Sequence, residues 1–242
     1  MSIKLKNLSL LQRSVDLNDL PEGKLLINTI NAHSYNMAQE DELFAEALTN
    51  GVLIPDGISI VKAINWFEDS KIERTTGWDL FMFEMDRLNK RGGTCFFLGS
   101  NESVLEAIKN NAAIDYPNIQ IVSYSPPYKS DFTEEENKVM IEAINSAQPD
   151  LLWIGMTAPK QEKWVYSHWD ELKINCHVGT VGAVFDFYAG TIKRAPLWWQ
   201  KNNLEWLYRL IQEPRRLWKR YLIGNIIFLY KILKDRLFEV DS

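Results

Sequence analysis

The first 190 residues alternate between short apolar runs and longer amphipathic segments. The apolar runs are rich in Ile, Leu, Val and Phe and end at Gly, Pro, Asn or Asp, which is typical of buried strands. Such runs lie at 24–30, 52–54, 94–98, 119–124, 151–155 and 174–178. The segments between them place apolar residues at helical spacing, which predicts a helix after each of the first five strands. The helix after the second strand is expected over 58–67, and a further helix follows it over 78–89.

This regular alternation predicts an α/β fold with a mostly parallel, doubly wound, Rossmann-like sheet and short right-handed crossovers. The alternation stops after Gly190, and two amphipathic helical stretches follow over 196–212 and 214–238. We therefore expect a Rossmann-like α/β domain over residues 1–190 and a helical appendage over residues 191–242.

Charge divides the chain at the same point. The net charge is −5, but residues 191–242 carry 11 Lys and Arg against 5 Asp and Glu, which leaves the first 190 residues acidic. The basic stretch also holds four tryptophans and three tyrosines, at Trp198, Trp199, Trp206, Trp218, Tyr208, Tyr221 and Tyr230. Basic residues mixed with aromatic ones favour docking on an anionic membrane surface. The alternative is a helical hairpin packed on its own domain or on a second subunit of a homo-oligomer.

Several other classes of protein are disfavoured. The main body is acidic and contains no helix-turn-helix, zinc or RNA-binding signature, so we expect no nucleic-acid partner. No apolar run approaches the roughly 20 residues needed to span a bilayer, and the first residues lack the apolar core of a signal peptide. Cys95 and Cys176 lie far apart and are expected to be reduced, as in a cytosolic protein.

Polar residues follow the predicted strands, and in an open parallel sheet the ligand binds beyond the carboxyl ends of the strands. The glycines among them leave backbone N–H groups free to approach phosphate oxygens, which favours a nucleotide or another anionic ligand. The groups are Thr29 with Asn31, Asp56 with Gly57, Gly99 with Ser100, Lys160 with Gln161, and the turn from Gly179 to Gly182. The chain contains neither G-x-G-x-x-G nor a P-loop motif, which argues against a dinucleotide dehydrogenase and a P-loop NTPase.

Asp56 has two interpretations. An Asp-Gly pair before a helix is often an N-cap, whereas a partly desolvated carboxylate in a pocket can act as a general base. The chain has no Asp-x-Asp triplet, and its three histidines show no metal-ligand spacing, so we expect no metal. A leaving diphosphate would then be neutralised by cationic side chains, with Arg74, Lys193 and Arg194 as candidates.

Successive motifs along almost the whole chain resemble those of the WecG/TagA/CpsF glycosyltransferases. They are TINAH over 29–33, PDG over 55–57, RTTGWD over 74–79, APKQE over 158–162, FDFYAG over 185–190, KRAP over 193–196, LEWLYRL over 204–210 and EPRR over 213–216. At 179–182 this chain has GTVG, where many relatives have a more glycine-rich run.

The resemblance implies an inverting, metal-independent hexosyltransferase without a cofactor. The donor would be a UDP-sugar, often UDP-N-acetylmannosamine or its uronic acid. The acceptor would be a polyprenyl-diphosphate-linked sugar, such as one on undecaprenyl diphosphate. The enzyme would work in the cytoplasm, peripherally attached to the inner face of the cell membrane, in the biosynthesis of teichoic acid, capsule or exopolysaccharide. A non-catalytic nucleotide-sugar-binding or scaffold protein of a polysaccharide assembly complex is the alternative.

The resemblance also assigns roles to residues. It makes Asp56 the catalytic base, places Thr29, Asn31 and Gln161 beside it, and brings Arg209 and Arg216 from the appendage. Lys219 or Arg220 would supply a third basic group. The expected substrate-binding residues are Gly57, Arg74, Asp79, Gly99, Ser100, Gly155, Pro159, Lys160, Gly179, Gly182, Asp186, Lys193 and Arg194.

Overall fold

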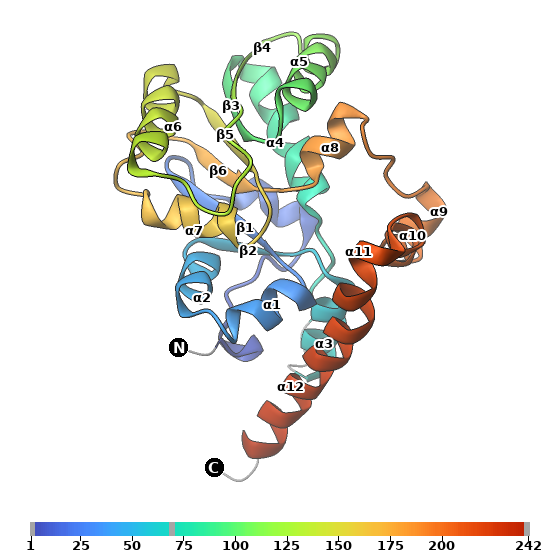
Figure 1. Cartoon of the computed structure of the whole chain (residues 1–242). Helices are drawn as coiled ribbons and strands as arrows, with labels where there is room; N and C mark the ends of the chain where they lie inside the picture. The colour runs from blue at the N-terminus through green and yellow to red at the C-terminus, as the bar shows by residue number, and fades with distance from the viewer. Residues whose placement is uncertain (1–2, 68–70, 240–242) are drawn as a thin grey trace.

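A six-stranded sheet, parallel throughout, forms the centre of the molecule (Figure 1). The computed structural model describes residues 3–67 and 71–239. The strand order is β2-β1-β6-β5-β3-β4, and every paired strand is parallel to its neighbour. The strands are β1 (Leu25–Ile30), β2 (Val52–Pro55), β3 (Gly93–Gly99), β4 (Ile119–Tyr124), β5 (Leu151–Gly155) and β6 (His177–Thr180). The predicted α/β fold class is therefore confirmed.

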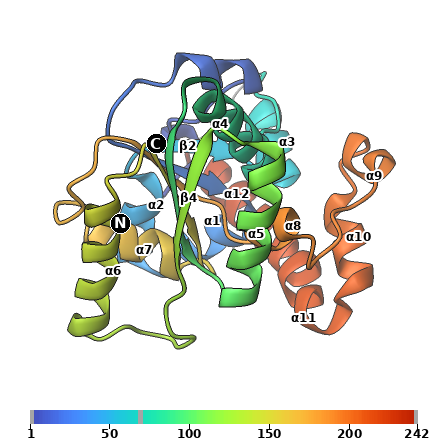
Figure 2. The same cartoon turned by 90° about the horizontal axis from the view of Figure 1, so that it is seen from above.

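Helices cover both faces of the sheet. Figures 1 and 2 show α4, α5 and α8 on one face and α2, α6 and α7 on the other. The helices of the α/β part are α1 (Ala32–Ala38), α2 (Glu42–Thr49), α3 (Ile58–Phe67), α4 (Gly77–Arg91), α5 (Glu102–Asp115), α6 (Glu134–Ala147), α7 (Lys160–Ser167) and α8 (Val184–Ala189). Short 3-10 helices lie at Leu5–Asn7 and Ser14–Asp19.

Side chains alternate between the two faces along each central strand, as the period of two requires. In β5, Leu151 and Trp153 pack beneath α4, α5 and α8, whereas Leu152 and Ile154 pack beneath α6 and α7. Both faces are thus buried, which explains why the strands form continuous apolar runs in the sequence.

The connections leaving β3 and β5 cover opposite faces, although these two strands are neighbours. Helix α5 follows β3 and packs against α8, while α7 follows β5 and packs against α2. Such a divergence creates a crevice at the carboxyl edge of the sheet. The fold therefore opens a crevice at the strand ends where the sequence has polar residues.

Two details of the α/β part differ from the sequence-based prediction. The single helix expected between the first two strands is two helices, because Asp41 caps the start of α2 by accepting a hydrogen bond from Phe44 N at 3.0 Å. Strand β6 begins three residues later than expected and contains Gly179. A Cβ atom at Gly179 would lie 2.2 Å from the Trp153 ring, so this glycine makes room for the largest buried side chain.

The C-terminal helical segment consists of α9 (Leu197–Lys201), α10 (Glu205–Gln212), α11 (Pro214–Trp218), a π-helical turn (Lys219–Ile223) and α12 (Gly224–Glu239). The sequence predicted two helices here, but a turn with Asn203 at φ 58° separates α9 from α10. Helix α12 packs along α1 (Figure 1), where Phe228 is fully buried and meets the Tyr35 ring edge-on at 5.3 Å. Over residues 3–67 and 71–239, no helix combines the length and apolar character needed to cross a membrane.

Candidate active site

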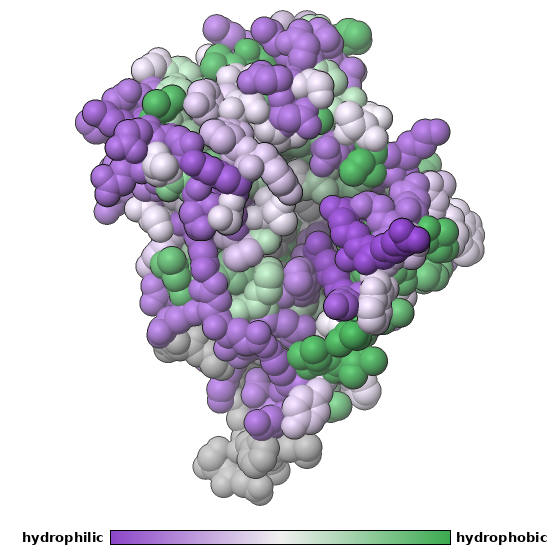
Figure 3. Space-filling model, viewed as in Figure 1, coloured by the Kyte–Doolittle hydropathy of each residue, from purple (hydrophilic) through white to green (hydrophobic). Residues whose placement is uncertain are grey.

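A cavity of about 1210 Å³ lies between the carboxyl edge of the sheet and the C-terminal helical segment. Figure 3 shows it as a hollow bordered on one side by strongly hydrophilic side chains. Its walls come from two parts of the chain that are distant in sequence. The α/β part contributes the ends of β1, β2 and β5, and the helical segment contributes Glu205, Trp206, Arg209, Arg216, Arg220, Tyr221 and Asn225.

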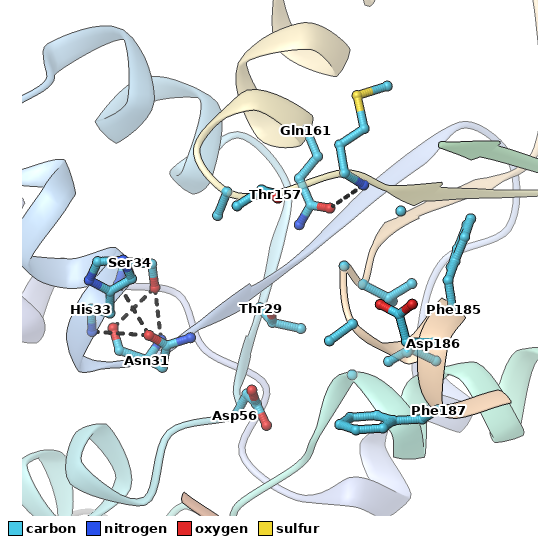
Figure 4. A pocket seen from close by; sticks show the side chains of 18 of the residues that line it. Thr29, Asn31, His33, Ser34, Asp56, Thr157, Gln161, Phe185, Asp186 and Phe187 are labelled. Carbon is cyan, nitrogen blue, oxygen red and sulfur yellow. Dashed lines mark hydrogen bonds between the residues drawn. The ribbon is translucent and has the colours of Figure 1, made fainter. Parts of the chain in front are cut away.

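Asp56 is held at the floor of this cavity by the turn after β2 (Figure 4). Its backbone N–H and that of Gly57 both donate to the carbonyl of Ile30, at 3.0 and 3.1 Å, which fixes the turn against the end of β1. A Cβ atom at position 57 would lie 2.7 Å from Asn31 Cβ. Glycine is therefore required next to Asp56 for the two strand ends to approach each other.

Asp56 is not the N-cap residue of α3. The carbonyl of Gly57, not that of Asp56, accepts the hydrogen bond from Val61 N that opens α3, at 3.2 Å. The Asp56 carboxylate faces Arg74 instead, with Oδ1 3.6 Å from Nη2, and its side chain is 33% exposed. Burial raises the pKa of Asp56; the Arg74 guanidinium opposes this rise, and the carboxylate of Glu205 adds to it.

Thr29 and Asn31, on either side of Ile30 at the end of β1, lie on the wall next to Asp56. Thr29 is the register partner of Ile54, two residues before Asp56. Asn31 caps α1, because its Oδ1 accepts hydrogen bonds from His33 N at 3.0 Å and Ser34 N at 3.2 Å. The end of β1 is therefore rigid where it meets the cavity.

Gln161 faces the cavity from the side opposite Asp56 (Figure 4). Its Oε1 accepts a hydrogen bond from Met156 N at 3.3 Å, and its Nε2 donates to Oε1 of Glu162 at 2.9 Å. Glu162 is buried, and burial raises its pKa to about 7. Two fixed partners thus orient the amide of Gln161.

A buried carboxylate joins the two walls of the cavity. Glu205 Oε2 accepts a hydrogen bond from Arg74 Nη2, and its Oε1 accepts one from Arg194 Nε, each at 3.1 Å. The Glu205 side chain is only 10% exposed. Arg74 also donates from Nε to the carbonyl of Asp56 at 2.6 Å, so the bridge extends to the turn that carries Asp56.

The arginines of the helical segment differ in their pairing. Within the described residues, Nε of Arg209 and Nε of Arg220 are buried and have no hydrogen-bond partner. Arg216 is 61% exposed and pairs with Glu213 at 2.6 Å. The π-helical turn brings Arg220 into the cavity wall, while Lys219 lies outside that wall, with its ammonium over the Trp218 ring. Of these two candidates for the third basic group, Arg220 is therefore the one that lines the cavity.

Most residues predicted from the sequence line this one cavity. They are Thr29, Asn31, Asp56, Gly57, Arg74, Ser100, Gly155, Pro159, Lys160, Gln161, Gly182, Asp186, Arg194, Arg209 and Arg216. Four lie outside the lining: Asp79 accepts hydrogen bonds from Thr76 at the start of α4, Gly99 packs on the Gly155 carbonyl, Gly179 packs on Trp153, and Lys193 is not part of the wall.

Glu162 and Glu205 are not among the site residues predicted from the sequence. Glu162 directly follows Gln161, and Glu205 is the first acidic residue of a strongly basic stretch. That isolation of a carboxylate among arginines is the signal that points to Glu205. Within the part of the chain that the structure describes, no three His, Cys, Asp or Glu side chains are grouped so as to hold a metal ion.

Comparison of the sequence with known proteins identifies a family. The family model described as "Glycosyl transferase WecG/TagA/CpsF family" matches residues 2–242. A Bacillus subtilis (strain 168) protein named N-acetylglucosaminyldiphosphoundecaprenol N-acetyl-beta-D-mannosaminyltransferase is 31% identical over 198 residues, which cover 81% of this chain and 75% of the relative. A Staphylococcus aureus (strain MW2) protein of the same name is 29% identical over 219 residues, 88% of this chain and 82% of that protein. This chain therefore belongs to the WecG/TagA/CpsF family and is a glycosyltransferase.

Proposed function

We propose that this enzyme transfers N-acetylmannosamine, or a closely related hexose or uronic acid, from a UDP-sugar to a polyprenyl-diphosphate-linked sugar. The observation that carries the proposal is a carboxylate, Asp56, that faces arginines from both walls of one large cavity. The relatives described above carry names that state an N-acetylglucosaminyl-diphosphoundecaprenol acceptor and an N-acetylmannosaminyl group. A role in teichoic acid or another cell-surface polysaccharide follows from such an acceptor.

In this proposal Asp56 is the general base. It takes the proton from the acceptor hydroxyl as that oxygen bonds to the anomeric carbon of the donor sugar. The bond from this carbon to the diphosphate oxygen breaks on the opposite side, so the configuration inverts and UDP leaves with the electron pair. The raised pKa of Asp56 supports the role, because a stronger base takes the proton more readily. Thr29, Asn31 and Gln161 then position the reacting sugars.

The leaving diphosphate is neutralised by arginines and not by a metal ion. The buried, unpaired Nε groups of Arg209 and Arg220 support this assignment, because a buried donor without a partner is costly and a phosphate oxygen would satisfy it. Arg216 and Lys160 add positive charge to the same cavity. Fixed cations of this kind stabilise charge that develops in the transition state.

The size of the cavity supports two substrates. About 1210 Å³ exceeds the roughly 300–1,000 Å³ of sites for single drug-sized ligands. We assign one end, near Ser100 and Lys160, to the nucleotide, and the mouth beside the helical segment to the lipid-linked acceptor. In this division residues 1–190 bind the donor, and residues 191–242 act as an appendage that completes the site.

The helical segment also docks the enzyme on the cytoplasmic face of the membrane in this proposal. Apolar side chains are exposed along it, at Leu197, Trp198, Ile211, Leu222, Ile223, Ile226, Ile227, Leu229, Tyr230 and Leu233. Figure 3 shows hydrophobic side chains gathered on this side of the molecule. Each Lys or Arg near an anionic leaflet adds about 1 kcal/mol, so the basic segment and its apolar face together give reversible attachment.

The test is a donor screen. UDP-N-acetylmannosamine, its uronic acid and UDP-N-acetylglucosamine are each incubated with synthetic polyprenyl-diphosphate-N-acetylglucosamine, and UDP release and product mass are measured with and without EDTA. We expect turnover with an N-acetylmannosamine-type donor, unaffected by the chelator. Asp56→Asn should keep nucleotide affinity and lose about 10²–10⁴ in kcat, whereas the exposed Asp170→Asn should behave as wild type. Near wild-type turnover in Asp56→Asn would refute the base assignment.

A further inference from the structure

One guanidinium, that of Arg74, faces two carboxylates. Its Nη2 lies 3.1 Å from Glu205 Oε2 and 3.6 Å from Asp56 Oδ1. Its Nε is already used, because it donates to the backbone carbonyl of Asp56. The nearer carboxylate therefore belongs to the helical segment and not to the turn that carries Asp56.

Glu205 is well placed to hold Arg74 in this position. It is the first residue of α10, it is buried, and its second oxygen is held by Arg194 at 3.1 Å. Two partly buried hydrogen bonds from different arginines fix the carboxylate more firmly than a single exposed ion pair would.

We propose that Glu205 is a positioning residue that holds the Arg74 guanidinium off the Asp56 carboxylate, and so keeps Asp56 basic enough to deprotonate the acceptor hydroxyl. This inference rests on the proposed role of Asp56 as the general base. The helical segment thus has a second role besides supplying arginines. When α10 moves away, Glu205 leaves Arg74, and the Arg74 guanidinium is then free to pair with the Asp56 carboxylate.

The other charged groups around Asp56 each raise or lower its pKa. Arg209 from α10 and Arg220 from the π-helical turn lower the pKa of Asp56, as Arg74 does, whereas Glu205 raises it. His33 of α1 lines the same cavity, and burial together with Arg220 lowers its pKa to about 4, so it is neutral above that pH. Removing the negative charge of Glu205 therefore leaves Asp56 among cations.

The test is the pH dependence of kcat/KM, whose acidic limb reports the ionisation of the base in the free enzyme. Glu205→Gln keeps the size of the side chain and an oxygen for the arginines but removes the charge. We expect the acidic limb to move to lower pH by about 1 unit, since a carboxylate that gains an arginine partner loses 1–3 pKa units. The plateau should fall by roughly tenfold, because a weaker base is a poorer catalyst.

A second substitution separates positioning from a merely structural role. Arg74→Gln should move the acidic limb to higher pH, and the double variant Glu205→Gln/Arg74→Gln should return it to the wild-type position or above. If Glu205 only held α10 in place, the losses in rate of the two single variants would add in the double variant. The acidic limb of the pH profile would then stay at its wild-type position. Titration of the Asp56 carboxyl by carbon-13 NMR gives the same readout where turnover is too slow, and Glu142→Gln, on the exposed face of α6, is the matched control.

The outcomes separate this inference from the proposed function. An inactive Asp56→Asn together with unchanged acidic limbs in Glu205→Gln and Arg74→Gln overturns the positioning role and leaves the general base in place. An active Asp56→Asn removes the base itself. If Glu205→Gln does not fold, Arg74→Gln decides alone, and an unmoved limb in that variant refutes the coupling.

Discussion

Gln161 Nε2 donates a 2.9 Å hydrogen bond to Oε1 of Glu162, the next residue of α7. Both side chains are buried, although both line the cavity. Because Met156 N occupies the oxygen of the same amide, Gln161 has one fixed orientation. A titratable group thus orients a residue that lines the cavity.

The buried Glu162 should make the stability of the protein depend on pH. Its pKa is raised from 4.5 to about 7 in the folded state, so between these values the folded protein holds a proton that the unfolded chain releases. The free energy of unfolding should therefore fall as pH rises through this window, by about 3 kcal/mol, and level off above it. Glu162→Gln removes this contribution while it keeps an oxygen for Gln161.

Urea unfolding at pH 5 and pH 8 measures the effect. The free energy of unfolding of Glu162→Gln should exceed that of the wild type by more at pH 8 than at pH 5. Glu142→Gln should show no such difference between the two pH values. An equal change at both pH values would mean that Glu162 is ionised throughout.

The arginines of the helical segment should act on the leaving group. Arg209→Ala and Arg220→Ala should each lower kcat by about 10²–10³, with smaller effects on KM, because the charge on the diphosphate grows in the transition state. Lys219→Ala should change kcat little, since Lys219 lies outside the cavity lining. A short-chain acceptor in the assay keeps membrane binding out of the comparison. A larger loss in Lys219→Ala than in Arg220→Ala would reverse the assignment of the third basic group.

Gly179 should matter for stability and not for nucleotide binding. Gly179→Ala forces a methyl group to within 2.2 Å of the Trp153 ring, and overpacking of this kind costs about 1–3 kcal/mol. Urea unfolding should show that loss, while calorimetry below the transition should give unchanged UDP affinity. In the control Gly77→Ala the nearest atoms are 3.6 Å away, so its stability should stay within about 1 kcal/mol of the wild type. If Gly179→Ala is stable but binds UDP more weakly than the wild type, that result would support the diphosphate contact predicted at Gly179 from the sequence.

The exposed face of α12 should set the strength of membrane attachment. Ile226 and Tyr230 are 68% and 64% exposed, and burying a large apolar side chain contributes about 1.5–3 kcal/mol. Ile226→Glu/Tyr230→Glu should therefore weaken sedimentation with phosphatidylglycerol vesicles at least tenfold. The control Ile114→Glu/Val139→Glu introduces the same two charges at exposed positions of α5 and α6, away from this face, and should sediment as the wild type. Equal binding of the two variants would exclude this face as the docking surface.

Much of the molecule follows from the sequence alone. The alternation of apolar runs with helical periodicity determines the parallel α/β fold, because a strand buried on both faces requires a continuous apolar run. Polar residues follow several of the predicted strands, namely Thr29, Asn31, Asp56 and Gln161. They predict one site, because parallel strands bring their carboxyl ends to one edge of the sheet. These residues do line one cavity.

Only the tertiary structure decided how the charges pair. Nothing in the local sequence shows that Glu205 reaches Arg74, 131 positions away, or that Gly57 and not Asp56 opens α3. In the sequence Gly179 resembles part of a phosphate-binding turn. In the structure the ring of Trp153, from the neighbouring strand, occupies the space next to its Cα atom. Lys219 and Arg220 are neighbours in the π-helical turn, and their placement relative to the α/β part decides that Arg220 lines the cavity and Lys219 does not. Periodicity specifies faces within an element, whereas contacts between distant elements depend on how the packed helices are placed in space.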